Sequence, residues 1–455
     1  MNKLSVSKMI IISSMMIFLF HSMNTQAQTE VKNIPAVLGV REQVEVVNQI
    51  ILKRFEQLLP AIMEQTGFDM WIIACNEDNP DPVYETMIPH KLWCPITQVL
   101  VLYHSGPGTS VERLNISRCN LSGLFDNVWN SGAWDKDQGE SQWECLGRIV
   151  RERDPKKIGI NIGEIQWAAG GLTVPMMNRI TEALGKKYTE RLGSAEPMTI
   201  LWGMTLLDEE IEIMEHAQAI SHAILAEIFS NRVITPNITT IEDLEYYYWQ
   251  RAVDLGLEKS FNPAFRIRAR LSADARKLDK TDIVIRPGDA IKCDVGLKYM
   301  RYNTDHQEWG YVLRQGENEA PESLRKLMAE GNRLQDIYCA EFKEGLTGNE
   351  ILTNILNRAR EQGIPNPRIY SHSVGYFPHE PGPLIGLPWE QVNEPGRGDV
   401  KLSANSTYTA ELSVAMPVPE LDGQQLVFGM EEVVLFTGKE TVFMDGRQTS
   451  FYLIR

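Results

Sequence analysis

Two aspartates, Asp294 and Asp305, lie eleven residues apart in a stretch where apolar and polar residues alternate as they do in β-strands. If residues 290–298 and 303–313 form an antiparallel hairpin with its turn near 299–300, the two carboxylates face each other across the strands. Facing side chains in such a pair are about 5 Å apart. Two carboxylates at that distance repel each other and lose hydration, so we expect a positive group to hold them.

Further candidate ligands follow downstream. The segment IYSHSVGYFPHEPGP supplies His372 and His379. Strand-forming residues surround Glu411 in STYTAELSVAMPV, and also Glu431 with its neighbour Glu432 in LVFGMEEVVLFTG. Acidic residues are unusual inside such apolar strands. Several carboxylates with one imidazole offer hard oxygen donors and a nitrogen, which suits Mn²⁺, Fe²⁺, Co²⁺ or Zn²⁺ better than Ca²⁺ alone or a thiolate site.

From about residue 200 to its end, the chain resembles the pita-bread metallopeptidases, a family that includes aminopeptidase P, prolidase and methionine aminopeptidase. The residues that match the family's pattern are Asp294 and Asp305 at the family spacing, His372, His379 seven positions later, Glu411, and Glu431 six residues before Thr437. The N-terminal half is similar, more loosely, to the N-terminal domain of creatinase and prolidase. The resemblance implies an α/β N-terminal domain over 35–200 and an α+β pita-bread catalytic domain over 201–455.

The resemblance also implies metal-assisted hydrolysis at a centre of two divalent ions, with Mn²⁺ as the first candidate and Zn²⁺, Co²⁺ or Fe²⁺ as the others. On the family pattern, Asp305 and Glu431 bridge both ions, and Asp294 binds one of them. His372 and Glu411 complete the other. Glu411 is also implied to take a proton from the attacking water and pass it to the leaving nitrogen.

His379 is implied to hydrogen-bond the substrate or the tetrahedral intermediate. Substrates of this family on a two-domain architecture are short peptides with proline in second position. Because neighbouring subunits help to close the site in such proteins, we expect a homodimer or a higher homo-oligomer.

Several groups outside the ligand set depart from the family pattern. The family has a histidine about seventeen residues before the first aspartate, whereas here Lys277 stands at that place and no histidine lies between 222 and 306. The usual D-[IL]-[TS]-R is replaced by residues 305–308, DHQE, and Gly429 replaces an arginine. Outer groups tune reactivity. Two alternatives to an Xaa-Pro peptidase therefore stay open: a hydrolase of another small C–N substrate, as creatinase is, and an inactive binding module.

The surrounding pattern indicates the elements that position these residues. In the N-terminal half, residues 46–67 have helical spacing, and buried-strand runs are expected over 68–75, 97–104 and 156–162. A domain boundary is expected near residue 200. Two amphipathic helices then follow over 207–234 and 239–257. The first contains His216 and His222, which are six apart and so do not share a face as i, i+4 ligands do; we expect packing or surface roles for both.

Composition limits the kinds of protein that this chain can be. A length of 455 residues with 43% hydrophobic residues predicts two domains of ordinary size. The formal charge of −15 argues against binding nucleic acid or an anionic membrane surface. The first residues have two lysines, an apolar run and a small-residue exit at Ala27, which is typical of a secretory signal peptide over 1–27. We therefore expect a secreted or periplasmic protein with no membrane attachment after cleavage.

The six cysteines are widely spaced and contain no CxxC pair, which argues against a thiolate zinc site. Four of them lie between Cys75 and Cys145. An oxidising compartment permits disulfides among these four, but the spacing does not select a pairing.

Overall fold

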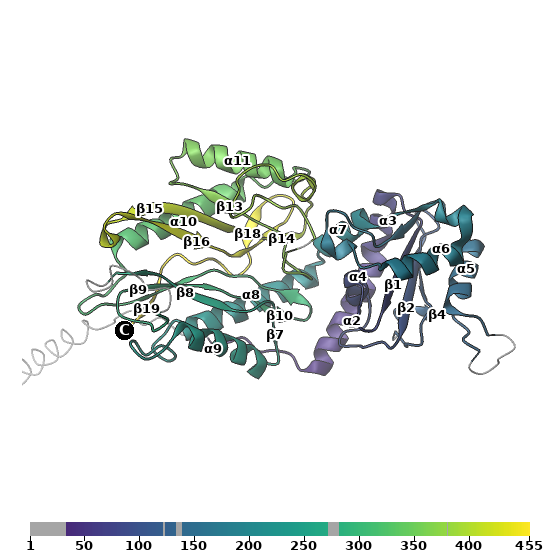
Figure 1. Ribbon diagram of the computed structural model, residues 1–455, viewed down its shortest axis with the longest axis horizontal. Helices are drawn as coiled ribbons and strands as arrows, with labels where there is room; N and C mark the ends of the chain where they lie inside the picture. Colours follow the sequence, from purple (N-terminus) through teal and green to yellow (C-terminus); the bar gives the residue numbers. More distant parts are fainter. Residues whose placement is uncertain (1–32, 122, 133–138, 272–281, 380) are drawn as a thin grey trace, which may run out of the picture.

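The computed structural model describes residues 33–121, 123–132, 139–271, 282–379 and 381–455. The expected signal peptide at 1–27 and Lys277 lie outside the described residues. An N-terminal and a C-terminal part lie side by side, with the helix α7 (Glu196–Met204) between them (Figure 1). None of the helices in the described ranges combines the length and the apolar character needed to cross a bilayer.

The N-terminal part is built on one mixed sheet, which has six strands in the described residues, in the order β4-β3-β2-β1-β5-β6. The strands are β1 (Met70–Asn76), β2 (Thr97–Tyr103), β3 (Glu112–Asn115), β4 (Asp126–Asn127), β5 (Ile158–Ile160) and β6 (Leu192–Ser194). The central strand β1 pairs antiparallel with β2 and parallel with β5. Because Trp71 and Ile73 enter one core and Met70 and Ile72 another, the sheet is covered on both faces.

Helices cover both faces of this sheet (Figure 1). One face packs on α5 (Gln142–Arg153) and α6 (Val174–Thr189). The other packs on α2 (Val40–Gln57), α3 (Leu59–Thr66), α4 (Pro82–Met87) and α7. The single helix expected over 46–67 is in fact broken at Leu58, because Pro60 in the first turn of α3 has no N–H to continue the preceding helix. Gly67 ends α3 in the left-handed conformation, with φ of 72°.

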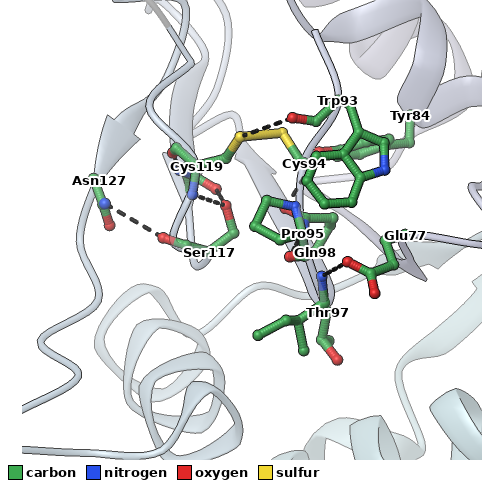
Figure 2. Close-up of a disulfide and its surroundings, with 12 residues drawn as sticks. Glu77, Tyr84, Trp93, Cys94, Pro95, Thr97, Gln98, Ser117, Cys119 and Asn127 are labelled. Atoms are coloured by element: carbon green, nitrogen blue, oxygen red, sulfur yellow. Dashed lines mark hydrogen bonds between the residues drawn. A yellow bond between two sulfur atoms is a disulfide. The ribbon is translucent and has the colours of Figure 1, made fainter.

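A disulfide joins Cys94 to Cys119 in the N-terminal part, with 5.6 Å between their Cα atoms. Figure 2 shows the bond beside Trp93, whose backbone oxygen contacts the Cys119 sulfur, and beside Ser117. Cys75 and Cys145 are buried free thiols. The structure therefore selects one pair from the four cysteines that the sequence left open.

The C-terminal part places strands between two pairs of helices (Figure 1). On one side, α8 (Asp208–Ile228) and α9 (Ile241–Asp254) pack against the sheet β19-β12-β9-β8. On the other, α10 (Glu322–Ala340) and α11 (Gly348–Glu361) pack against β13-β15-β16 and β14-β17-β18. The strands are β7 (Glu258–Lys259), β8 (Ala264–Arg270), β9 (Asp289–Asp294), β10 (Leu297–Tyr299), β11 (Tyr302–Asn303), β12 (Trp309–Val312), β13 (Arg368–Tyr370), β14 (Ser406–Thr409), β15 (Glu411–Val418), β16 (Gln424–Met430), β17 (Val433–Phe436), β18 (Thr441–Phe443) and β19 (Tyr452–Ile454). The α/β and α+β classes expected from the sequence are both confirmed.

The hairpin that carries the two aspartates exists, but its predicted register is wrong by two residues. Its turn is at Met300 and Arg301, which both have positive φ, and not at 299–300. Val295 consequently pairs with His306, and Asp294 and Asp305 are diagonal neighbours rather than directly opposite. A shift of two keeps every side chain on its original face, so both aspartates still point the same way.

A buried ion pair links the two parts of the molecule. Arg54 of α2 contacts Glu210 of α8, with 2.6 Å between Nη1 and Oε2, and both side chains are fully buried. Tyr302 and Tyr376 donate hydrogen bonds to the other oxygen of Glu210. Because a buried charge without its partner is costly, this cluster fixes how the N-terminal part sits against the C-terminal part. The expected boundary near residue 200 falls within α7.

Candidate metal centre

Five strand ends bring the candidate ligands to one place in the C-terminal part. Asp294 ends β9, Asp305 follows β11, His372 follows β13, Glu411 begins β15, and Glu431 lies between β16 and β17. Hydrogen bonds between Gln307 and Glu431 join the hairpin to the β16–β17 strands, and Tyr370 pairs with Glu411. Residues that are far apart in sequence are therefore held by sheet ladders rather than by loops.

The candidate ligand atoms of this centre lie close together. Asp305, His372 and Glu431 each offer a ligand atom within 4.8 Å of the other two, and all three are buried. The Nε2 atom of His372 lies 3.8 Å from Glu431 Oε1 and 3.9 Å from Glu411 Oε2. Within the described chain, Asp305 Oδ1 and Glu431 Oε1 are buried without a hydrogen-bond partner. Buried polar atoms normally have partners, so these two oxygens are suited to hold a cation.

The carboxyl groups of the centre disfavour one another's charge. Burial, and then the neighbouring carboxylates, raise the pKa values of Asp305 and Glu431 well above their usual range. Burial raises the pKa of Asp294 and brings that of Glu411 to about 7. Four carboxyls that resist ionisation in the metal-free protein are the expected state of a site built for divalent cations.

His372 is prepared as a neutral nitrogen ligand. Its Nδ1–H donates to the backbone oxygen of Ser373 at 3.2 Å, which leaves the Nε2 lone pair toward Glu431 and Glu411. Burial, with a contribution from His379, lowers the pKa of His372 to about 3. A hydrogen bond from the other ring nitrogen is the usual way in which a protein orients a metal-binding histidine.

His379 lies beside this centre but is more exposed than the other residues. Its ring centroid is 4.6 Å from that of His372, and its backbone oxygen accepts a hydrogen bond from Arg397. The structure thus places His379 at the edge of the cluster, in reach of a molecule that enters it.

Two residues of the centre were not assigned from the sequence. Gln307 donates from Nε2 to Glu411 at 2.8 Å and to Asp294 at 3.4 Å, and so joins two of the carboxylates. The charge of Lys292 opposes, without cancelling, the rise in the pKa values of four carboxyls: Asp294, Asp305, Glu411 and Glu431. Both residues stand two positions from an aspartate on the same strand face, which is the sequence signal that identifies them.

Lys292 lies beside Gly429, the position at which the family pattern has an arginine. A Cβ atom added to Gly429 would lie 3.0 Å from the Lys292 Nζ and 3.5 Å from Gln307 Oε1. The absence of a side chain at Gly429 therefore admits the lysine, and a positive group is kept near the centre by another residue.

A match to known proteins agrees with this geometry. Residues 212–438 match the model of metallopeptidase family M24, and the chain belongs to this family. The region matched contains all five candidate ligands. No curated protein matches the chain.

Solved structures show the same fold over nearly the whole chain. An X-Pro aminopeptidase from Thermotoga maritima is similar, with a TM-score of 0.60, 16% identity, and coverage of 86% of this chain and 99% of that one. An Xaa-Pro dipeptidase from Bacillus anthracis has a TM-score of 0.57, 15% identity, and coverage of 90% and 100%. A putative aminopeptidase P from the same organism has a TM-score of 0.58 at 14% identity and covers 88% and 96%. The two-domain fold with a pita-bread C-terminal domain is thereby confirmed.

Proposed function

We propose that this M24 metallopeptidase hydrolyses short peptides, with Xaa-Pro bonds as its preferred substrates, and that Asp294, Asp305, His372, Glu411 and Glu431 hold two divalent metal ions. The observation that carries the proposal is the convergence of Asp305, His372 and Glu431 within 4.8 Å, buried, with two carboxylate oxygens that lack a partner in the described chain. The oxygen-rich donor set suits Mn²⁺ first, and Zn²⁺, Co²⁺ or Fe²⁺ as alternatives.

The residues of the centre divide the chemical work. When bound, the ions make a water acidic and polarise the scissile carbonyl. Glu411 takes the proton of the attacking water and delivers it to the leaving nitrogen; the amide of Gln307, 2.8 Å from its Oε1, holds this carboxylate in place. His379, at the edge of the cluster, donates a hydrogen bond to the reacting peptide.

A basic cavity beside Glu411 supports a short peptide as the substrate. The cavity has a volume of about 330 Å³ and is lined by Glu411, Tyr370 and three cations, Lys292, Arg268 and Arg368. A free peptide carboxylate close to the scissile bond fits this charge, and only a peptide of a few residues brings its C-terminus that near. The names of the similar structures, an X-Pro aminopeptidase and an Xaa-Pro dipeptidase, support proline at the cleaved bond.

The proposal includes a secreted or periplasmic location and a homodimeric or larger assembly. The expected signal peptide over 1–27 and the Cys94–Cys119 disulfide support an oxidising compartment. The net charge of −15 supports neither nucleic acid nor an anionic membrane as a partner.

A second candidate function follows from the changed groups around the ligands. Gln307 and Gly429 stand where the family pattern has other residues, and Lys292 rather than an arginine supplies the local charge. These changes favour, as the alternative, a creatinase-like hydrolase that acts on another small C–N substrate with a carboxylate. A binding module without activity is disfavoured because such a module has no need to maintain four mutually repelling carboxylates.

The test is reconstitution of the chelator-treated protein with Mn²⁺, Co²⁺ or Zn²⁺, followed by assays on Xaa-Pro and Xaa-Ala dipeptides and tripeptides and on creatine. Faster cleavage of the Xaa-Pro peptides, absent in Glu411→Gln, supports the proposal. Hydrolysis of creatine alone would favour the second candidate, and metal binding with no hydrolysis of any of these substrates would favour the binding module.

A further inference from the structure

A second cluster lies on the reverse face of the strands that carry the metal centre. His306 follows Asp305 and Glu432 follows Glu431, and alternation along an extended strand sends each neighbour to the opposite side. There they meet His222 of α8. All three side chains are buried. The packing or surface role expected for His222 from the sequence does not account for these contacts. His216, for which the same was expected, contacts only the backbone oxygen of Ala36 among its described hydrogen-bond partners.

The three side chains have the spacing of ligands around one ion. One atom from each lies within 4.8 Å of the other two. Glu432 Oε2 is 3.1 Å from His222 Nε2 and 3.1 Å from His306 Nδ1. Ligand atoms about 2.0–2.2 Å from a tetrahedral zinc ion are themselves about 3.3–3.5 Å apart, so a small movement of these groups accommodates a metal.

Neighbouring groups hydrogen-bond the far atoms of His222 and Glu432, an arrangement that is also common around metal-binding side chains. The Asp445 carboxylate lies 2.7 Å from His222 Nδ1, the ring nitrogen that faces away from Glu432. The backbone N–H of Gln448 donates to the second oxygen of Glu432 at 3.0 Å. A carboxylate behind a histidine fixes its tautomer and raises its basicity toward a metal. His306 Nδ1 contacts Glu432, whereas its other ring nitrogen, Nε2, is buried without a hydrogen-bond partner in the described chain.

The cluster adjoins a cavity that gives access to it. This cavity, of about 590 Å³, has His222, Asp445, Glu308, Arg447 and Tyr452 among its lining residues. An ion can therefore enter from solvent, and a water molecule or small anion can take the remaining coordination position.

We propose that His222, His306 and Glu432 bind a further divalent transition-metal ion of the Zn²⁺ class, at a site separate from the M24 centre. Two imidazoles and one carboxylate are a donor set that zinc prefers, whereas the M24 centre has one imidazole and four carboxylates. The ion joins α8 to the hairpin and to the β16–β17 connection, and thereby braces from behind the two segments that carry Asp305 and Glu431. A hydrogen-bonded His–Glu–His network without metal is the competing state.

The experiment separates the two sites by stoichiometry. Chelator-treated full-length protein is titrated with Zn²⁺, and bound metal is counted by mass spectrometry after gel filtration for wild type, Asp305→Asn and His222→Gln, with His216→Gln as a matched control on the same helix. We expect Asp305→Asn to retain one zinc ion whose X-ray absorption spectrum shows two imidazole ligands. We expect His222→Gln to lose one ion relative to wild type, and His216→Gln to lose none.

Equal zinc content in wild type and His222→Gln, or an Asp305→Asn protein that binds no zinc, would overturn the proposal. If His222→Gln does not fold, Asp445→Asn decides the question, because this side chain is partly exposed and acts only behind His222. Its zinc site is expected to weaken about 10–100-fold, and unchanged affinity would count against the site. All of these measurements are independent of peptidase activity.

Discussion

Glu431 and Glu432 are adjacent, and each side chain is 1% exposed, yet their pKa values shift in opposite directions. Burial and then Asp305 raise the pKa of Glu431 well above its usual range. Burial alone would also raise the pKa of Glu432, but hydrogen bonds from His222 and His306 lower it to about 2. The short connection between β16 and β17 therefore presents a carboxyl with a raised pKa to one face and a carboxylate with a lowered pKa to the other.

The difference shows that burial alone does not set the pKa of a carboxyl group, because the charged and hydrogen-bonding groups around it also contribute. On the histidine face, the protein supplies its own compensation, since the pKa of His222 is raised to about 10: burial opposes the charge, but hydrogen bonds to Asp445 and Glu432 outweigh it. On the acidic face, four carboxyls share the positive charge of Lys292. Ionisation of the carboxyls on the acidic face therefore depends on an added cation, whereas on the histidine face a metal ion competes with protons.

The strongest test of this contrast is Asp305→Asn. The substitution removes an oxygen ligand from the face that depends on cations, so we expect the M24 centre to lose metal and peptide hydrolysis to fall below detection. Metal analysis and peptide assays on the same preparation check this, with Glu56→Gln, an exposed acid on α2, as a control for loss of one charge. An active, metal-loaded Asp305→Asn enzyme would contradict the assignment of Asp305 as a ligand.

Glu411→Gln is expected to have the next largest effect. The substitution keeps the shape of the side chain and the contact with Gln307 but removes the proton acceptor. Because general-base catalysis typically contributes about 10²–10⁴-fold, we expect kcat to fall by that factor while the fold is unchanged. Steady-state kinetics at saturating metal measure the change, and a drop of less than tenfold would mean that another group accepts the proton.

His379→Ala tests the residue at the edge of the cluster. Loss of one donor to a developing oxyanion typically costs about 10²–10³-fold. If His379 acts mainly on the transition state, kcat and kcat/KM fall together while metal content stays the same. His216→Ala is the matched control, since this histidine lies on α8 away from the centre. A silent His379→Ala would show that the substrate is held by a different group.

Sequence reasoning identified the elements and ligands that follow simple periodic rules. The strands over 68–75, 97–104 and 156–162 appear as β1, β2 and β5, and Glu431 joins Asp305 because alternation directs Glu432 away. The hairpin register failed because its turn is at 300–301, a position that residue types alone did not reveal. The error left the faces correct, since it was an even number of residues.

The histidine cluster was not predicted because it depends on tertiary packing. His222 reaches His306 and Glu432 from a helix that is remote in sequence, and no spacing rule connects these positions. The break in the helix at Leu58 was missed for a different reason, because Pro60 was included in an otherwise regular apolar pattern.

A smaller effect is expected on the stability of the metal-free protein. The pKa of Glu411 is raised from 4.5 to about 7, so the folded chain holds a proton that the unfolded chain releases, and stability falls as the pH rises between these values. Asp305→Asn removes another carboxyl with a raised pKa. We expect thermal unfolding of the metal-free variant at pH 7 to show a gain of about 1 kcal/mol over wild type, since one unit of pKa shift corresponds to about that free energy, with a weaker dependence on pH. A metal-free variant less stable than wild type would contradict the repulsion described above.

An effect of similar size is expected for Lys292→Met, which removes the positive charge that the four carboxyls share. If Lys292 also binds the substrate carboxylate in the adjoining cavity, KM rises about tenfold, since a hydrogen bond to a charged group contributes about 1.5 kcal/mol or more, while kcat changes less. Gly429→Arg alone brings a second cation beside Lys292, whose Nζ would lie 3.0 Å from the added Cβ and has to shift. In the Lys292→Met background that space is open, and the arginine is expected to restore KM. A fall in metal affinity at constant KM would instead limit Lys292 to balancing the charge of the carboxylates.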